Sequence, residues 1–165
     1  MLPIRPATPA DATLLQPLIQ RAYRGEAARA GWTHEADLIE GERIAIDDLA
    51  ALIADPAERL LLVEEDGAPI GCVRLADLGD GLAYLGLLAV EPAQQAHGIG
   101  RALIAAAEAT ARDTLGAGRI EMTVIDCRAE LIAYYGRRGY AVVGTRAFPI
   151  PLDPPLSMVV LEKPL

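Results

Sequence analysis

The spacing of hydrophobic residues changes along the chain between a helical and a strand-like repeat. Four segments repeat their apolar positions with the spacing of one helix face. Thr8 and Pro9 are typical of a helix start, whereas Pro56 and Gly139 are typical of positions that follow a helix end. The predicted helices span about 9–23, 47–54, 99–115 and 128–137.

Shorter apolar runs, separated by turn residues, predict strands. Asp66-Gly67 and Gly79-Asp80-Gly81 divide three consecutive runs, a pattern typical of an antiparallel meander. A meander followed by alternating strands and helices predicts an α/β (α+β) fold, with a mixed, mostly antiparallel central sheet of about seven strands flanked by about four helices. Segment 25–41 is expected to be irregular or a broken helix. The predicted strands are 4–5, 59–65, 70–78, 82–90, 120–125, 140–145 and 157–163.

Length and composition narrow the class of protein. The 165 residues fit a single domain over 1–165, and a chain that is 52% hydrophobic and 23% charged has the balance of a soluble globule. No apolar stretch is long enough to span a bilayer, and the N-terminus does not have the layout of a secretory signal. We therefore expect a cytoplasmic protein with no membrane association.

Charge and metal-binding residue types exclude two further classes. A net charge of −8 argues against a nucleic-acid partner, because phosphate contacts need a basic face. The same charge suits a cationic substrate, although acidity for solubility explains it equally well. Cys72, Cys127, His34 and His97 have no recognisable ligand spacing, so no metal site is expected.

A glycine-containing turn carries the first candidate chemistry. Gln95-Ala96-His97-Gly98-Ile99-Gly100 joins an apolar strand to the helix predicted at 99–115. Its two glycines allow close approach to an anion, and the N–H groups and dipole of the first helical turn favour phosphate. Arg101 could add a countercharge. The alternative for an isolated glycine pair is a simple tight turn.

The sequence around this turn resembles a known family. Val90-x-Pro92-x-x-Gln95-x-x-Gly98-x-Gly100 is similar to the acetyl-coenzyme A motif of GNAT-type N-acetyltransferases. The segment Tyr135-Gly-Arg-Arg-Gly-Tyr140 resembles that family's helix end, Tyr-x-x-x-Gly-aromatic. The order of the predicted elements agrees along nearly the whole chain.

Two positions depart from the family's pattern. Ala96 replaces a usual glycine, and Arg128 stands where the family often has an asparagine that contacts the cofactor. The resemblance implies a GNAT-like fold and acetyl-coenzyme A as cosubstrate, held through its pantetheine and thioester by the strand main chain and through its pyrophosphate by the turn. The cofactor-binding residues that it implies are Leu88, Ala89, Val90, Gln95, Ala96, His97, Gly98, Ile99, Gly100, Arg101 and Arg128.

The resemblance also assigns candidate catalytic residues. Tyr135 is the expected general acid for the departing thiolate, since a phenol is protonated at neutral pH, and Tyr134 is the competing assignment. The family often has a carboxylate base on the strand at 82–90, but this strand contains none. Glu35 or His34 could take the proton from the amine instead. A direct-attack enzyme could also draw its neutral amine from solution.

The acceptor pocket is expected where the family builds it, around the irregular segment. Trp32 would either form one wall or fill the edge of the core, and Phe148 could form the opposite wall. Tyr84 could order a water molecule or simply pack in the sheet. The expected pocket residues are Tyr23, Trp32, Thr33, Tyr84 and Phe148.

The expected function is transfer of an acetyl group from acetyl-coenzyme A to a primary amine, by direct attack in a ternary complex. The acceptor is a small molecule or a peptide. One alternative is a catalytically weak or inactive acyl-coenzyme A-binding sensor or interaction module. Another is an acyl-enzyme formed on Cys127. An edge strand near the C-terminus could pair two copies into a homodimer.

Overall fold

A computed structural model describes residues 2–24, 43–95, 97–149, 151–152 and 154–165. Ala96 and the expected site residues of the irregular segment lie outside these ranges. Those residues are Trp32, Thr33, His34 and Glu35.

The described helices lie where the hydrophobic spacing places them. At the first helix, the Thr8 N–H donates to Asp11 Oδ2 at 2.7 Å, so the chain enters a 3₁₀ turn at Pro9–Asp11 before the α-helix. Arg5 holds the same carboxylate and lowers the pKa of Asp11 to about 2. The helices are α1 (Ala12–Tyr23), α3 (Ile46–Ala54), α4 (Ile99–Asp113) and α5 (Ala129–Gly136).

The described strands form one seven-stranded sheet and confirm the mixed, mostly antiparallel architecture. Tyr140 was expected to begin a strand, but it precedes β6 because its ring is buried and its hydroxyl donates to Glu108 of α4 at 3.0 Å. The strands are β1 (Ile4–Pro6), β2 (Glu58–Glu65), β3 (Ala68–Gly79), β4 (Leu82–Val90), β5 (Arg119–Ile125), β6 (Ala141–Ala147) and β7 (Ser157–Pro164).

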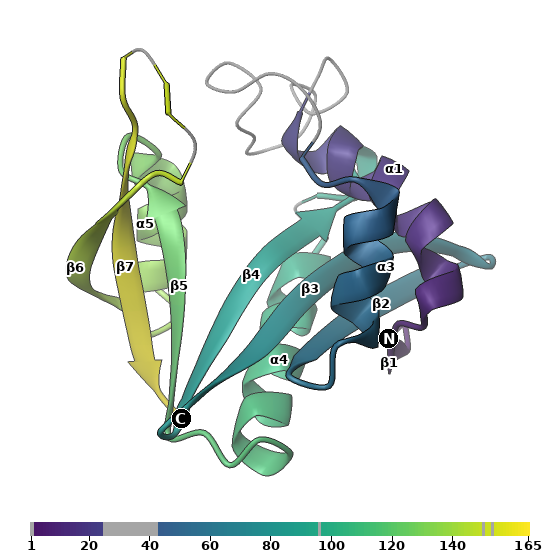
Figure 1. Ribbon diagram of the computed structural model, residues 1–165, viewed down its shortest axis with the longest axis horizontal. Helices are drawn as coiled ribbons and strands as arrows, with labels where there is room; N and C mark the ends of the chain where they lie inside the picture. The colour runs from purple at the N-terminus through teal and green to yellow at the C-terminus, as the bar shows by residue number, and fades with distance from the viewer. Residues whose placement is uncertain (1, 25–42, 96, 150, 153) are drawn as a thin grey trace.

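The sheet opens at its centre, between β4 and β5. The strand order is β1-β2-β3-β4-β5-β7-β6, and β4–β5 is the one parallel pair in the described sheet. The two strands pair only from Leu82–Arg119 to Tyr84–Glu121, and beyond that point they diverge (Figure 1).

An extra residue in β4 lies at the start of the divergent segment. Cys72 of β3 pairs with Ala89, whereas Arg74 pairs with Gly86, so one more residue is present on β4 than on β3. Leu87, inside this bulge, has a φ of 49°. A bulge bends its strand and increases its twist. It therefore helps to turn the end of β4 away from β5.

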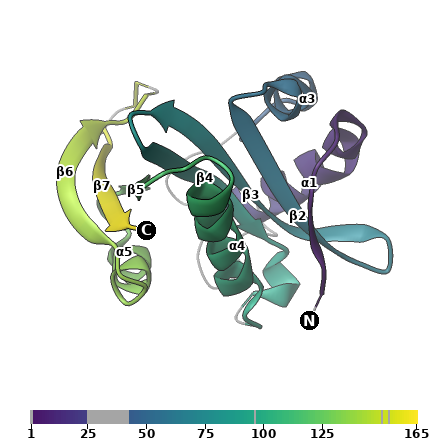
Figure 2. The ribbon, with the colours of Figure 1, turned by 90° about the horizontal axis from the view of Figure 1, so that it is seen from below.

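Helices cover both faces of the sheet around β2, β3 and β4 (Figure 2). Leu60 and Leu62 of β2 pack in the core under α1 and α3, and Leu61 and Val63 pack in the core under α4. This continuous apolar run is explained by cover on both faces. Residues of α5 join the same core as α4. No described helix is long and apolar enough to cross a membrane.

Gly71 of β3 lets α4 lie directly on the sheet. A Cβ atom at Gly71 would lie 3.0 Å from Leu103 Cδ1 and 3.1 Å from Ile99 Cγ2, both on α4. Ile99 is the first residue of that helix. The close contact therefore positions the N-terminus of α4 at the end of β4.

Candidate active site

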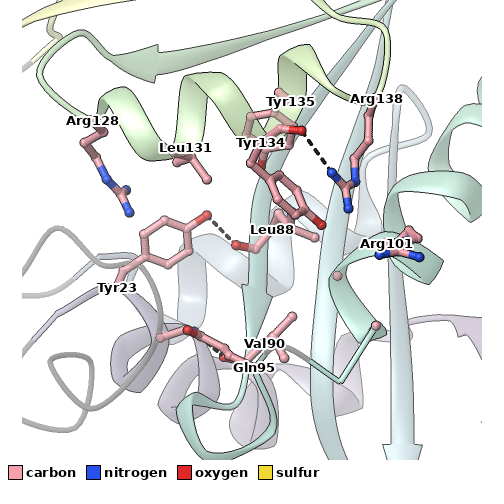
Figure 3. A pocket seen from close by; sticks show the side chains of 13 residues that line it. Tyr23, Leu88, Val90, Gln95, Arg101, Arg128, Leu131, Tyr134, Tyr135 and Arg138 are labelled. Atoms are coloured by element: carbon pink, nitrogen blue, oxygen red, sulfur yellow. Dashed lines mark hydrogen bonds between the residues drawn. The ribbon is translucent and has the colours of Figure 1, made fainter.

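A cavity of about 250 Å³ lies at the N-terminus of α4, and we refer to it as the turn cavity. Its walls come from the end of α1, the end of β4, the turn before α4, and α5 (Figure 3). The described residues that line it are Ala22, Tyr23, Leu88, Val90, Gln95, Gly98, Gly100, Arg101, Arg128, Leu131, Tyr134, Tyr135 and Arg138.

The two glycines of the turn contribute to the site in different ways. Gly98 caps α4 with φ at +83°, a left-handed conformation that side chains other than glycine rarely adopt, and its carbonyl accepts from the Ala102 N–H. A Cβ at Gly100 would lie 3.7 Å from the Tyr134 hydroxyl, across the cavity. The first-turn N–H groups of α4, together with the helix dipole, make this end favourable for an anion.

Three residues that were expected to bind cofactor do not line the cavity. His97 is exposed, Ala89 is buried on the α1 side of the sheet, and Ile99 packs against the core beside Gly71. Any contact of Ala89 or Ile99 with a ligand would therefore come from main-chain atoms.

Two carbonyl groups of β4 accept hydrogen bonds from side chains. The Tyr23 hydroxyl donates to the Leu88 carbonyl at 2.6 Å, and Gln95 Nε2 donates to the Val90 carbonyl at 3.2 Å (Figure 3). Both lie on the part of β4 that has separated from β5. Side chains thus satisfy polar groups that a neighbouring strand does not.

A second cavity, of about 260 Å³, lies between the diverging ends of β4 and β5, and we refer to it as the wedge cavity. Tyr84 and Phe148 line it, as the expected acceptor pocket requires. Its other described lining residues are Tyr23, Arg24, Arg43, Leu85, Gly86, Leu87, Leu88, Met122, Thr123, Val124, Ile125, Arg128, Leu131, Tyr135, Pro149 and Met158.

The two cavities meet at a shared wall. Five described residues line both: Tyr23, Leu88, Arg128, Leu131 and Tyr135. Tyr134, in contrast, lines the turn cavity and is not among the described residues that line the wedge cavity. The structure therefore distinguishes the two neighbouring tyrosines, because Tyr135 is the one that reaches both spaces.

Tyr135 is held rigidly in an aromatic cluster. Its side chain is 5% exposed, and its ring makes edge contacts with Tyr134 and Tyr140 at centroid distances of 5.4 and 5.9 Å. Burial, with smaller contributions from Tyr23 and Tyr134, raises the pKa of the Tyr135 phenol well above its ordinary value. The hydroxyl is therefore protonated at neutral pH, as a proton donor requires.

Arg138 is a site residue that the sequence analysis missed. Its guanidinium lies 3.6 Å from the centroid of the Tyr134 ring, and Nη1 donates to the Tyr134 carbonyl at 3.0 Å. Its Nε is buried with no hydrogen-bond partner in the described part of the chain. The spacing of four residues from Tyr134 could have placed it on the same helix face.

The described cavity walls contain no carboxylate and no imidazole. Glu35 and His34, the expected bases, lie outside the described residues. Cys127 is exposed and is not among the described residues that line either cavity. Within the described ranges no group of His, Cys, Asp and Glu is placed to hold a metal ion.

Comparison with protein families identifies the class. The model of the Acetyltransferase (GNAT) family matches residues 16–140. The chain therefore belongs to the GNAT family of acetyltransferases. A comparison with curated proteins finds no match.

Solved structures share the fold over the whole chain. The PaiA N-acetyltransferase from Thermoplasma acidophilum in complex with coenzyme A is 19% identical, with a TM-score of 0.80 over 100% of this chain and 99% of that one. The ribosomal-protein-S18-alanine N-acetyltransferase from Escherichia coli is 17% identical, with a TM-score of 0.76 over 99% and 94%. A spermidine N-acetyltransferase chimera from Vibrio cholerae and hSSAT is 19% identical, with a TM-score of 0.74 over 99% and 96%.

Proposed function

We propose that the protein transfers an acetyl group from acetyl-coenzyme A to a primary amine, by direct attack in a ternary complex. The junction of the two cavities carries this proposal, because Tyr23, Leu88 and Tyr135 line both. A donor in the turn cavity and an acceptor in the wedge cavity would meet there without an acyl-enzyme. The position of Cys127 outside both described walls also favours direct attack.

The turn cavity suits coenzyme A. Gly98 and the first turn of α4 offer N–H groups, and Arg101 and Arg138 add positive charge for the phosphate groups of the cosubstrate. The Leu88 and Val90 carbonyls accept side-chain hydrogen bonds and could accept from a pantetheine amide instead.

The thioester supplies the acetyl group, and residues of the chain handle the protons. The amine nitrogen forms a bond to the acetyl carbon, and the carbon–sulfur bond breaks. Tyr135 donates its phenolic proton to the departing thiolate and recovers a proton from solvent. Among the described walls there is no base, so two routes stay open for the proton of the amine: the amine is drawn from solution in its neutral form and loses its second proton to solvent after attack, or Glu35 or His34 takes the proton. Glu35 and His34 stay predicted bases.

Two measurements test the proposal. Coenzyme A should bind with a 1:1 heat signal in calorimetry, and a panel of amines, amino acids and peptides should release thiol from acetyl-coenzyme A. We expect Tyr135→Phe to lower kcat about 100-fold, which is the lower range for a lost general acid, and to leave coenzyme A affinity unchanged. Tyr140→Phe is the matched control, because it removes a hydroxyl from the same aromatic cluster at a residue that is not among the described lining of either cavity. Its hydroxyl also donates to Glu108, so thermal unfolding checks that this variant is folded.

The second candidate function is a sensor or interaction module that binds acyl-coenzyme A without turnover. The lack of a base in the described walls favours it. Binding of coenzyme A with no thiol release across the whole panel would support the module and exclude the transferase. Release that is unaffected by Tyr135→Phe would retain the transferase but exclude Tyr135 as its acid.

A further inference from the structure

Two hydroxyl groups bridge the wedge cavity at its narrow end. The Tyr84 and Thr123 hydroxyl oxygens lie 3.2 Å apart, and either atom could donate the hydrogen bond. Tyr84 belongs to the last main-chain pair between β4 and β5, and Thr123 lies two residues beyond that pair on β5. Both residues are among the described lining of the wedge cavity. The two strands are therefore still connected through side chains where their main chains begin to separate.

Gly86 lets the Tyr84 ring lie along β4. A Cβ atom at Gly86 would lie 2.7 Å from Tyr84 Cε1 and 3.3 Å from the Tyr84 hydroxyl oxygen, so the ring occupies the space that a side chain at position 86 would fill. Two residues further along the strand is Leu88, which belongs to the wall shared by the two cavities. Because position 86 has no side chain, the Tyr84 hydroxyl lies between the paired part of β4 and the junction.

A cation–π contact also holds the Tyr84 ring. The Arg74 guanidinium lies 5.5 Å from the ring centroid, and Arg74 is the partner of Gly86 across the β3–β4 ladder. Arg74 is held in turn by Glu58, which accepts from Arg74 Nε at 2.7 Å. The neighbours of the ring thus fix its position without a ligand. A group that is held in this way is preorganised for binding.

The hydrogen-bonding capacity of the wall points to the same two hydroxyls. The N–H groups of an amine need acceptors, and the arginines of the wall offer donors only. The Tyr23 hydroxyl donates to the Leu88 carbonyl, and Tyr135 is the proposed proton donor to the thiolate. Each hydroxyl oxygen has two lone pairs, so Tyr84 and Thr123 keep accepting capacity beyond their mutual bond. Within the described wall they are suited to accept from an amine.

We infer that the Tyr84–Thr123 hydroxyl pair receives the amino group of the acceptor and orients it. This inference rests on the proposed transferase function and identifies residues that position its substrate. A neutral primary amine has two N–H groups and one lone pair. When each hydroxyl oxygen accepts one N–H, the lone pair points away from the hydroxyls and stays available for the acetyl carbon. An uncharged pair also holds the amine without favouring the ammonium form, as a carboxylate would.

The first test compares a primary amine with its N-methyl derivative, which has one N–H group fewer. n-Butylamine and N-methylbutylamine form one pair, and the best amine of the panel is compared with its own N-methyl derivative. The parent should have the higher kcat/KM with the primary amine. We expect Tyr84→Phe and Thr123→Val each to reduce this preference at least about threefold, the effect of one neutral hydrogen bond.

The Michaelis constants locate the effect. KM for the amine should rise in both variants, whereas KM for acetyl-coenzyme A should not change, because neither residue is among the described lining of the turn cavity. A preference for the primary amine that is the same in the parent and in both variants overturns the inference and leaves the transferase function intact.

Two control variants remove a hydroxyl elsewhere. Tyr140→Phe acts in the aromatic cluster, and Thr110→Val removes a hydroxyl that donates to the Ala106 carbonyl within α4. Neither residue is among the described lining of the wedge cavity. Both controls should keep the preference of the parent, and thermal unfolding checks that every variant is folded. An equal loss of preference in the controls would overturn the inference, because the effect would not depend on the cavity.

Gly86→Ala displaces the Tyr84 ring while both hydroxyls remain in the chain. The added methyl group would meet Tyr84 Cε1 at 2.7 Å, so the ring has to shift. We expect a loss of preference similar to that of Tyr84→Phe, and little further loss when the two substitutions are combined, because both act on the same hydroxyl. Full additivity of the two losses would contradict a role for the placement of this hydroxyl.

A binding measurement decides the question without turnover. n-Butylamine is the probe, because its amino group is its only polar group. With coenzyme A present at about pH 9, where part of the amine is neutral, it should bind at least about threefold more weakly to Tyr84→Phe and Thr123→Val than to the parent in calorimetry. No binding to the parent, or equal binding to all three, overturns the inference. If thiol release is absent for every amine, the transferase proposal fails, and this comparison still decides whether the hydroxyl pair receives an amine.

Discussion

Tyr135 shows how one position acquires a chemical property from its surroundings. Tyr134 and Tyr135 are adjacent in the sequence and have the same side chain. Tyr135 is buried against two rings and lines both cavities, whereas Tyr134 lies under Arg138 in the turn cavity. Burial raises the pKa of Tyr135, and its place in the walls of both cavities makes it the better candidate for proton donation at the junction.

The raised pKa of Tyr135 has a consequence for the pH dependence of kcat. Because its pKa is raised, the Tyr135 phenol keeps its proton even where the pH exceeds about 10, the ordinary pKa of a tyrosine. We therefore expect that kcat, at saturating acceptor, does not decline between pH 7 and about pH 10, because the phenol keeps its proton over this range. A decline with a midpoint below about pH 10, present in the parent and absent in Tyr135→Phe, would contradict the assignment.

Arg138 should contribute to coenzyme A binding. Its buried Nε has no partner in the described chain, and its side chain faces the same cavity as Arg101. We expect Arg138→Met to raise the Kd for coenzyme A about tenfold or more, the effect of one hydrogen bond to a charged group. Arg137→Met is the control, because Arg137 is exposed and adjacent but is not among the residues that line the cavity. Equal weakening by both variants would point to a general charge effect.

At the scale of elements, α4 packs closely on β3 at Gly71. The helix begins at Ile99, whose side chain touches the space that a Cβ at Gly71 would fill. We therefore expect a change on β3 to affect the position of the turn that is proposed to bind phosphate, although β3 itself is not among the described walls of the turn cavity.

Gly71→Ala should act on both stability and binding. The added methyl group would meet side-chain atoms of Leu103, Ile99 and Val63 at 3.0 to 3.1 Å, so these neighbours have to give by a few tenths of an ångström. We expect a loss of about 1–3 kcal/mol in the free energy of unfolding and a weaker affinity for coenzyme A. Gly144→Ala serves as the control, because a Cβ there meets nothing within 4 Å. Urea unfolding and calorimetry measure the two effects, and an unchanged affinity would show that α4 adapts without shifting its N-terminus.

Over the whole molecule, the two halves of the sheet are joined by few main-chain contacts. β4 and β5 pair at three positions only. A polar cluster adds a second connection: Glu108 of α4 accepts from Lys163 of β7 at 3.0 Å and from the Tyr140 hydroxyl at 3.0 Å. The two halves of the sheet are therefore connected on the α4 side, while β4 and β5 remain apart at the wedge cavity.

Breaking this cluster should destabilise the protein. Glu108→Gln leaves the partly buried Lys163 without its charged partner. We expect a loss of about 2 kcal/mol in the free energy of unfolding, typical of hydrogen bonds to charged groups. Glu130→Gln, at an exposed position on α5, is the control. A thermal midpoint that is the same for both variants would show that the connection contributes nothing.

Assembly and location stay predictions. The edge of the sheet that lies near the C-terminus is β6, which is exposed along its length and presents Val142 and Val143, whereas β7 is paired on both sides. A homodimer through this edge, a single domain and a cytoplasmic location are consistent with the fold and await direct measurement.

The sequence by itself determined the elements and predicted the donor site. The bounds of α1, α3 and the meander follow from local features: the apolar spacing, the cap at Thr8 and the glycine-containing turns between the strands. Each of these features depends on residues only a few positions apart. The turn before α4 is equally local, since a left-handed glycine and a helix start are adjacent in the chain.

Only the tertiary structure decided what the site can hold. The divergence of β4 from β5, the bulge at Leu87 and the meeting of two cavities at Tyr135 depend on segments far apart in the chain. Net charge is a sum over all residues, whereas a ligand senses the groups within a few ångströms. For that reason the acidic composition alone does not tell which groups a ligand meets in the folded wedge.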